Sequence, residues 1–291
     1  MSKVAIVTDS NSGITQSQAG KLRLHVLPMP FTVDGESHFE GINLTHETFY
    51  ERQNNGADIR TSQPSPGTVM DLWNKLLKDY DEIVHIPMSS ALSASCESAI
   101  VLSREFDNKV QVVDNKRISV TQRQTAVESV ALADTGCNAL QIKEHLEKAS
   151  LDASIYILMD TLKYLKKGGR ITPAAAAIGT ILNIKPVLQI QGGKLDSYAK
   201  ARGSKQGRKI MIEAIKNDLS TRFSEAANPE CMQLYIVCSD NIGVGKSYEN
   251  EAKEAFPGYD IFLDVLPLSV ACHIGPGAVA IACCKKLNCL K

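Results

Sequence analysis

The sequence predicts an α/β protein made of two domains. Its 291 residues exceed the roughly 100–200 residues of a typical single domain. Short β-branched runs alternate with helical patterns through the first half of the chain, which is typical of a parallel sheet covered by helices. The pattern changes near residue 152, so we expect one domain at residues 1–152 and a second at residues 153–291.

Composition narrows the class of protein. Hydrophobic residues make up 44% of the chain and charged residues 22%, as in soluble globular proteins with a sizeable core. The 32 basic residues balance the 32 acidic ones, so net charge does not attract the chain to nucleic acid or to an anionic membrane. No apolar run approaches the roughly 20 residues that span a bilayer, and the N-terminal segment is too short and too acidic for a signal peptide. We therefore expect a cytoplasmic protein with no nucleic-acid partner and no stable membrane insertion.

The first domain begins with Lys3–Thr8, a β-branched run that predicts a buried strand ending in a polar turn. A helix start is expected at Ser65 and Pro66, because serine suits the N-cap and proline the first helical position. Apolar residues from Val69 to Tyr80 then recur at helical spacing. The other expected elements are an extended piece at 26–33 broken by prolines, strands at 82–88 and 110–113, and helices at 45–53, 95–105, 121–134 and 138–149.

The second domain has a less regular order of elements. Leu162–Arg170 predicts a short helix with a glycine stop, and Pro173–Ile184 predicts an apolar helix. Strands at 185–190 and 194–198 are expected to form a hairpin around Gly192 and Gly193. The remaining expectations are a strand at 154–159, helices at 205–227 and 246–256, strands at 233–238 and 260–266, and a last helix at Pro276–Leu287.

Motifs for nucleotide binding and catalysis are incomplete. Gly245-Lys246-Ser247 resembles the end of a phosphate loop, but Asp240 stands where the first glycine of that motif belongs. No G-x-G-x-x-G follows the first strand, and neither H-E-x-x-H nor G-x-S-x-G occurs. The eight cysteines form no C-x-x-C pair, so we expect free buried thiols and no metal site. No cofactor is indicated.

Three segments concentrate hydroxyl side chains where predicted strands end. They are Thr8–Ser12, Thr61–Ser65 and Ser89–Ser95. A serine before a helix is most often a cap, but three such loops at one edge of a parallel sheet would form a site for an anion such as a carboxylate.

His273 is the histidine with the most distinctive surroundings. It precedes Ile274-Gly275-Pro276-Gly277, where glycines let the backbone approach closely and a helix is expected to start. Its imidazole is a candidate donor to a bound oxygen.

Taken together, the motifs resemble the DegV family of bacterial fatty-acid-binding proteins along nearly the whole chain. The resemblance rests on their order and spacing: Ile6-Val7-Thr8-Asp9-Ser10, Thr61-Ser62-Gln63-Pro64, Ser89-Ser90-Ala91-Leu92-Ser93-Ala94-Ser95, Leu165-Lys166-Lys167-Gly168-Gly169-Arg170-Ile171, Ile184-Lys185-Pro186-Val187-Leu188 and His273-Ile274-Gly275-Pro276-Gly277. It implies two α/β domains, the first with a parallel Rossmann-like sheet and the second with a mixed sheet, and a fatty acid bound between them.

The resemblance also implies roles for individual residues. The carboxylate of the fatty acid is expected to contact Thr61, Ser62, Ser93 and the N–H of Ala94, in a network that reaches His273. Members of the family present the fatty acid to a separate kinase, which makes an acyl-phosphate for phospholipid synthesis. Arg170 and Arg202 match residues that are candidates for the kinase contact.

Two features refine these expectations. Family members commonly have Gly-Leu-Ser-Gly-Thr where this chain has Ala91-Leu92-Ser93-Ala94-Ser95, so two alanines replace glycines that can adopt positive φ. The acyl chain requires an apolar tunnel, for which we expect the residues Ile178, Ile181, Leu182 and Leu188.

The chain is thus expected to be a non-catalytic lipid-binding protein. An independent acyl hydrolase that uses Ser93 and His273 is an alternative, and so is a lipid-transport or sensing module without a kinase.

Overall fold

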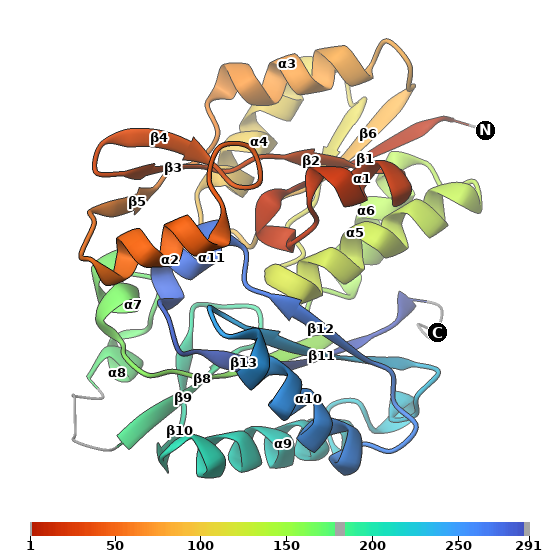
Figure 1. Cartoon of the computed structure of the whole chain (residues 1–291). Helices are drawn as coiled ribbons and strands as arrows, with labels where there is room; N and C mark the ends of the chain where they lie inside the picture. The colour runs from red at the N-terminus through yellow and green to blue at the C-terminus, as the bar shows by residue number, and fades with distance from the viewer. Residues whose placement is uncertain (1, 178–183, 288–291) are drawn as a thin grey trace. The chain divides into compact units, whose positions relative to one another are not determined.

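The computed structural model describes residues 2–177 and 184–287. The chain divides into two compact units, Met1–Leu151 and Asp152–Lys291, called unit 1 and unit 2 below. Unit 1 contains a four-stranded parallel sheet and unit 2 a six-stranded mixed sheet, so the predicted α/β class with these two kinds of sheet is confirmed (Figure 1).

The parallel sheet of unit 1 has the strand order β2-β1-β6-β7. In the register of its central pair, Val7 lies opposite His85 and Thr8 opposite Ile86, so β1 and β6 end level with each other. The loops after these two strands therefore meet at the carboxyl edge of the sheet, where parallel sheets bind ligands. The bounds are β1 Val4–Asp9, β2 His25–Leu27, β6 Glu82–Ile86 and β7 Val110–Val112.

Helices cover both faces of this sheet (Figure 1). On one face α3 (Pro66–Leu76) and α4 (Ser95–Ser103) pack on a core that contains Val7, Trp73 and Ile83. On the other face α5 (Ser119–Asp134) packs against β1, and α6 (Ala139–Lys148) against β6 and β7. Ser65 caps α3 and Pro66 occupies its first turn, as predicted.

A second, three-stranded antiparallel sheet in unit 1 was not expected. Its order is β4-β3-β5, and β5 ends at Thr61. The extended piece predicted at 26–33 is divided between the two sheets. Pro28 and Pro30 lack the backbone N–H groups that one continuous strand would need for its hydrogen bonds. The remaining bounds are β3 Pro30–Val33, β4 Glu36–Phe39, β5 Ile59–Thr61, α1 Gln16–Lys21 and α2 His46–Asn54.

Unit 2 is organised around a mixed sheet of order β10-β9-β8-β13-β11-β12, in which only β11 and β12 pair in parallel. Helices α9 (Ser204–Ser220) and α10 (Ile242–Ala255) pack against this sheet over a core that includes Met211, Ile236 and Tyr248. The strand bounds are β8 Ala153–Leu158, β9 Ile184–Ile190, β10 Asp196–Arg202, β11 Met232–Cys238, β12 Ile261–Val265 and β13 Val279–Lys285.

The helix predicted at Pro276–Leu287 is wrong. The segment forms β13, which lies between β8 and β11 and pairs with both. Six of its seven residues are buried, so the strand shows a continuous apolar run in place of the alternation that identifies a half-exposed strand. The helix in this region is α11 (Leu268–Ile274), which precedes the glycines.

Other boundaries in unit 2 also differ from the predictions. The apolar helix predicted at Pro173–Ile184 cannot extend to its expected end, because Ile184 begins β9. The helix found here is α8 (Pro173–Ala176), and residues 178–183 lie outside the described residues. The long helix α9 ends at Ser220, and the one-turn helix Ser224–Ala226 follows it.

Most of the described cysteines are free thiols. Cys231 is disulfide-bonded, so the expectation of free thiols is wrong for this residue. The free buried cysteines are Cys96, Cys238, Cys272, Cys283 and Cys284. Within residues 2–177 and 184–287, no cluster of metal-ligating side chains occurs, and no helix has the length and apolar character needed to cross a membrane.

Candidate functional site

The carboxyl end of β1 is a buried hydrogen-bond network centred on Asp9. Asp9 Oδ1 accepts from the backbone N–H of Asn11 (3.0 Å), from Asn11 Nδ2 (2.9 Å) and from Gln122 Nε2 (3.0 Å). Asp9 Oδ2 accepts from the N–H of Met88 (2.8 Å), which ties the end of β1 to the loop after β6. Burial raises the pKa of Asp9, while these hydrogen bonds oppose the shift.

The hydroxyl groups near Asp9 bond within the protein. Thr8 Oγ1 donates to the carbonyl of Ile86 (2.9 Å), Ser12 Oγ donates to the carbonyl of Asp9 (2.8 Å), and Ser10 Oγ accepts from the N–H of Met29 (3.0 Å). The segment Thr8–Ser12 is thus an internal brace for the edge of the sheet.

The loop Ser89–Ser95 after β6 presents the N-terminal end of α4. Ser90 anchors it through Asp114, since Ser90 Oγ donates to Asp114 Oδ2 (2.5 Å). Ser93 Oγ accepts from the N–H of Ser95 (3.2 Å). Ala94 is the N-cap residue with φ −71° and provides no side-chain cap, and the first N–H groups of a helix have no acceptor within the helix.

The alanines that replace glycines in this loop cause no backbone strain. Ala94 has an ordinary negative φ, and Ala91 is absent from the described residues with positive φ. The expected conflict between these alanines and a left-handed backbone does not arise.

The loop Thr61–Ser65 approaches α4 from the small sheet. Thr61 is the last residue of β5, so the expectation that all three hydroxyl loops follow strands of one sheet is wrong. The N–H of Ser62 donates to the carbonyl of Pro30 (3.1 Å), and Ser98 Oγ donates to Gln63 Oε1 (3.3 Å). The second bond brings this loop beside the first turns of α4. Thr61 and Ser93 are half-buried, whereas Ser62 and Ala94 are exposed.

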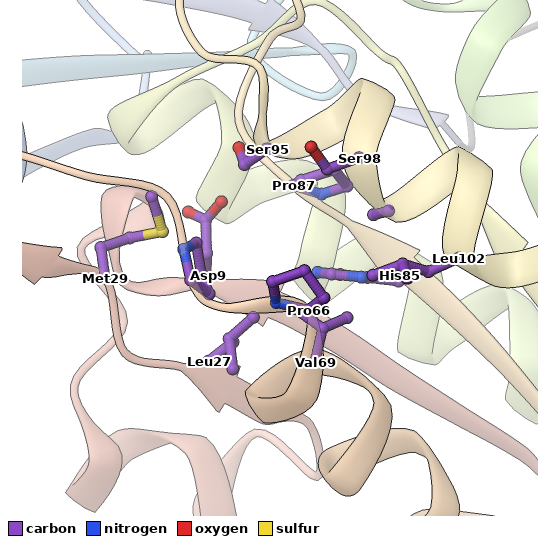
Figure 2. A pocket seen from close by; sticks show the side chains of 12 residues that line it. Asp9, Leu27, Met29, Pro66, Val69, His85, Pro87, Ser95, Ser98 and Leu102 are labelled. Carbon is purple, nitrogen blue, oxygen red and sulfur yellow. The ribbon is translucent and has the colours of Figure 1, made fainter.

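A small pocket of about 10 Å³, room for about one water molecule, lies in unit 1 between the sheet and the helices α3 and α4 (Figure 2). This volume is far below the roughly 300–1,000 Å³ of ligand pockets. Its polar lining is Asp9, His85, Ser95 and Ser98, and its apolar lining is Leu27, Met29, Pro64, Pro66, Val69, Pro87, Ala99 and Leu102. Pro64 and Ser95 also belong to the two hydroxyl loops, so the pocket begins where those loops meet.

His85 is a polar residue of the pocket that the sequence did not single out. It lies on β6, and Trp73 of α3 packs edge-on against its ring at 5.5 Å between centroids. Burial lowers the pKa of His85 to about 4, so the imidazole is neutral at pH 7. A histidine inside an apolar strand has no sequence signal that separates a pocket residue from a core residue.

His273 lies near the C-terminal end of α11 in unit 2, not before a helix as predicted. Its ring occupies space left by Gly168, because a β-carbon on Gly168 would lie 2.2 Å from His273 Nδ1. Gly275 has φ +80° and leaves similar space for the ring of Tyr164. Burial, and next the positive charge of Arg170, lower the pKa of His273 to about 4.

The other predicted residues of unit 2 have different settings. Arg170 is half-buried, and its guanidinium donates to the carbonyl of Gly168. Arg202 is exposed at the end of β10. Leu188 is fully buried in β9. The other residues predicted for the acyl tunnel, Ile178, Ile181 and Leu182, lie outside the described residues.

Comparison with known proteins gives one consistent result. A sequence model of the DegV family of uncharacterised proteins matches residues 3–286. A DegV domain-containing protein of Staphylococcus aureus is 27% identical over 98% of this chain and 100% of its own length. Another from Caldanaerobacter subterraneus is 30% identical over 75% of this chain and 78% of its own length.

Solved structures agree with this result. A structure from Thermus thermophilus, described as fatty acid binding of a DegV family protein, has a TM-score of 0.86 and 26% identity, and the match covers 97% of this chain and 99% of that one. A structure from Bacillus subtilis, described as DegV, a fatty acid binding protein, has a TM-score of 0.85 and 25% identity, and the match covers 98% of this chain and 100% of that one.

Proposed function

This chain belongs to the DegV family, and on that premise we propose that it binds a long-chain fatty acid and presents it to a separate kinase for acyl-phosphate formation in phospholipid synthesis. The observation that carries the proposal is the meeting of two hydroxyl loops at the start of α4, where Ser98 Oγ donates to Gln63 Oε1. Donors gathered at the start of a helix suit the carboxylate of a fatty acid.

The carboxylate is assigned to the exposed end of α4. Ser93, Thr61 and Ser62 supply hydroxyl donors, and the N–H of Ala94 and the helix N-terminus add positive partial charge. A buried carboxylate without such partners would cost several kcal/mol. Short hydroxyl side chains bind the carboxylate without filling the space that an incoming phosphoryl group needs.

His273 is assigned as a further donor to the carboxylate, on the strength of the family resemblance. A neutral imidazole carries one N–H, and its low pKa keeps His273 neutral at pH 7. The role therefore requires the tautomer whose N–H points to the ligand, and not a positive charge.

The acyl chain is assigned to an apolar tunnel, as the family resemblance implies. Each methylene that leaves water contributes about 0.8 kcal/mol, so a modest number of buried methylenes supports tight binding. Contacts of the chain with Ile178, Ile181, Leu182 and Leu188 remain part of the proposal for unit 2.

The test is direct measurement of bound lipid. Protein purified from a bacterial host is expected to release fatty acid on denaturing extraction, detected by mass spectrometry. Ser93→Ala and His273→Ala are each expected to weaken binding of hexadecanoic acid by about tenfold or more, which corresponds to about 1.4 kcal/mol. Ser103→Ala is the matched control, because Ser103 lies at the opposite end of α4 and its hydroxyl donates to the carbonyl of Ile100. Full-strength binding by both variants would refute the assigned carboxylate site.

The kinase step needs its own experiment. With a bacterial fatty acid kinase and ATP, acyl-phosphate is expected only when this protein carries fatty acid. Arg170→Glu and Arg202→Glu are expected to raise the KM of the kinase for the loaded protein, and Arg202→Glu is expected to leave fatty-acid affinity unchanged. Acyl-phosphate formation that ignores both substitutions would remove the arginines from the proposed contact.

The acyl hydrolase alternative has a separate readout. Turnover of an acyl ester by the purified protein, abolished by Ser93→Ala, would replace the carrier proposal with an enzyme. If none of the kinases tested forms acyl-phosphate with the loaded protein, lipid transport or sensing is the remaining role.

A further inference from the structure

Unit 1 contains a second and much larger pocket at the amino end of β1. Its volume is about 820 Å³, within the roughly 300–1,000 Å³ of ligand pockets. Its walls come from the start of β1, from α1 and β2, from α3 and the segment after it, and from the last turns of α5. It is called the amino-edge groove below, and its lining includes Lys3, Val4, Gly20, His25, Tyr80 and Val130.

The groove exists because β2 is shorter than β1. β6 pairs with β1 from Val4 to Thr8, whereas β2 pairs only with Val7, Thr8 and Asp9. The first half of β1 therefore has no neighbouring strand on the β2 side, and the residues before β2 form α1 and the turn after it (Figure 1). Gly20 in α1 keeps the space open, since a β-carbon there would meet no atom of the described chain within 4 Å.

One backbone donor points into this space. The carbonyl of Lys3 accepts from the N–H of Asp81 (2.9 Å) and so faces the β6 side of β1. Because the peptide bond is planar and trans, the N–H of Val4 points in the opposite direction, toward the groove. No acceptor for this N–H occurs among residues 2–177 and 184–287.

Two side chains add polar groups to the groove. The ammonium of Lys3 lies 4.6 Å from the centroid of the Tyr80 ring and forms no ion pair within the described part of the chain. The ring of His25 packs edge-on against Tyr80, with 5.8 Å between centroids. Burial, and next the positive charge of Lys75, lower the pKa of His25, so its imidazole is neutral at pH 7. A shifted pKa in a pocket is typical of binding sites.

The other charges on the groove balance each other. Arg23 and Asp134 both line it, and Arg23 Nη1 donates to Asp134 Oδ1 (3.0 Å) while Nη2 donates to Oδ2. The charge of Lys3 is then the one without a counter-ion among the described lining residues. The apolar part of the lining includes Val4, Ile6, Leu24, Val26, Leu72 and Val130.

We propose that the amino-edge groove binds an amphipathic carboxylic acid, with its carboxylate at Lys3 and the N–H of Val4 and its body along the apolar lining. His25 is a further donor, since a neutral imidazole carries one N–H. The site is separate from the proposed fatty-acid site at the carboxyl edge. Val4 and Asp9 are the two ends of β1 and lie about 16 Å apart at roughly 3.3 Å per residue.

The lining distinguishes this ligand from other classes of molecule. An uncharged apolar molecule would take water from Lys3 and from the N–H of Val4 without replacing the lost hydrogen bonds. A second negative charge on the ligand would meet no unpaired cation in the described lining and would be repelled by Asp134. One carboxylate on an apolar body satisfies both conditions.

The experiment uses octanoate as the probe and the full-length protein saturated with hexadecanoic acid. Saturation blocks the proposed fatty-acid site, and mass spectrometry before and after the titration verifies that hexadecanoic acid stays bound. Calorimetry is expected to show one octanoate per protein, with a Kd of about 0.3 mM or lower. Octan-1-ol has the same apolar body without the charge and is expected to bind at least fivefold more weakly.

Two substitutions test the groove itself. Lys3→Met removes the charge of an exposed side chain and is expected to weaken octanoate binding at least fivefold. Gly20→Leu adds a side chain to the groove wall and is expected to weaken binding at least tenfold. Gly193→Leu is the control, because Gly193 in unit 2 has equally open surroundings. Thermal unfolding verifies that each variant folds, and the content of hexadecanoic acid is expected to match the wild type in all three.

Amide resonances in nuclear magnetic resonance spectra locate the probe. The signals of Val4 and Gly20 are expected to shift when octanoate is added, whereas those of Ser93 and Ala94 at the carboxyl edge stay in place. The reverse pattern would place octanoate in the fatty-acid site and overturn the inference.

Three further outcomes would overturn it. They are the absence of saturable octanoate binding, binding that survives both Lys3→Met and Gly20→Leu, and equal affinity for octan-1-ol, which would show that charge plays no part. None of these bears on the proposed fatty-acid site, which fails only if hexadecanoic acid itself does not bind. In that case the same titration on the lipid-free protein tests the groove.

Discussion

Unit 1 and unit 2 position their candidate ligand-binding residues by different means. In unit 1 the loops at the end of the sheet are fixed by hydrogen bonds, with Asp9 joining the end of β1 to Met88 and to Gln122. In unit 2 His273 is fixed by shape, because Gly168 leaves the volume that the imidazole fills. The stability of unit 1 should therefore be sensitive to the loss of polar atoms, and the stability of unit 2 to the addition of carbon atoms.

The largest effect is expected from removal of the Asp9 carboxylate. Asp9→Ala would leave the buried N–H groups of Met88 and Asn11 without their acceptor, at a cost of about 4 kcal/mol in the free energy of unfolding. Asp9→Asn, which keeps one oxygen acceptor, should cost less. Chemical denaturation measures both values. Equal stability of Asp9→Ala and the wild type would show that the network does not hold the edge of the sheet.

Adding one carbon to unit 2 is the reverse experiment. Gly168→Ala would place a β-carbon 2.2 Å from His273 Nδ1, and the displaced packing should cost about 3 kcal/mol. In a His273→Ala background the clash is removed, so the same substitution should then cost less than about 1 kcal/mol. Gly193→Ala is the control, since a β-carbon there meets no atom of the described chain within 4 Å. If Gly168→Ala costs the same stability in both backgrounds, the space left by Gly168 does not position His273.

Acid should weaken both units through their neutral histidines. His85 and His273 have folded pKa values of about 4 against an ordinary 6.5, so protonation favours the unfolded chain. The contribution of each neutral histidine to the free energy of unfolding is fully present above pH 6.5. It is lost as the pH falls toward 4, by about 2 kcal/mol per histidine between pH 7 and pH 5. Asp9 acts in the opposite sense, because a raised carboxyl pKa recovers stability as the pH falls.

The measurement for this prediction is a difference. Unfolding curves at pH 7 and pH 5 are compared for the wild type, His85→Phe and His273→Ala, with Asp9 present in all three. Each variant should lose less stability on acidification than the wild type does. Identical slopes would mean that neither histidine is held in its neutral form by burial.

The smallest effect is expected at Ser93. Ser93→Ala removes the acceptor for the N–H of Ser95 and should lower the free energy of unfolding by about 1 kcal/mol. Ser65→Ala at the start of α3 removes a similar cap and should cost about the same. Fatty-acid affinity distinguishes them, because only Ser93 is assigned to the carboxylate. If both variants lose the same fatty-acid affinity, Ser93 acts only as a helix cap and does not bind the carboxylate.

The sequence predicted elements well where local chemistry determines them. The Ser65–Pro66 helix start, the strands β1 and β6 and the αL residue Gly169 after α7 (Lys163–Gly168) all follow from residue types at particular backbone positions. The failures occur where long-range pairing decides. The sequence of β13 is a continuous apolar run because both faces of the strand are covered. The strands β3, β4 and β5 are short, and no local sequence pattern reveals how they pair.

The same distinction applies to the candidate site. Hydroxyl density located the loops, yet it also selected Thr8–Ser12, whose side chains bond internally. His85 was missed because a ring without partners can be recognised only from its three-dimensional surroundings. The need for glycine at Gly168 was equally hidden, since the residue that fills its space lies more than a hundred positions later in the chain.

The contact between Gly168 and His273 also constrains how relatives of this chain can diverge. A lineage that keeps the histidine cannot accept any side chain at position 168, whereas a lineage that loses the histidine is released from that restriction. Selection acting on one motif is thereby transmitted to the other, although neither codon is near the other in the gene. The two positions are expected to change together across descendants, glycine with histidine and larger residues with its replacement.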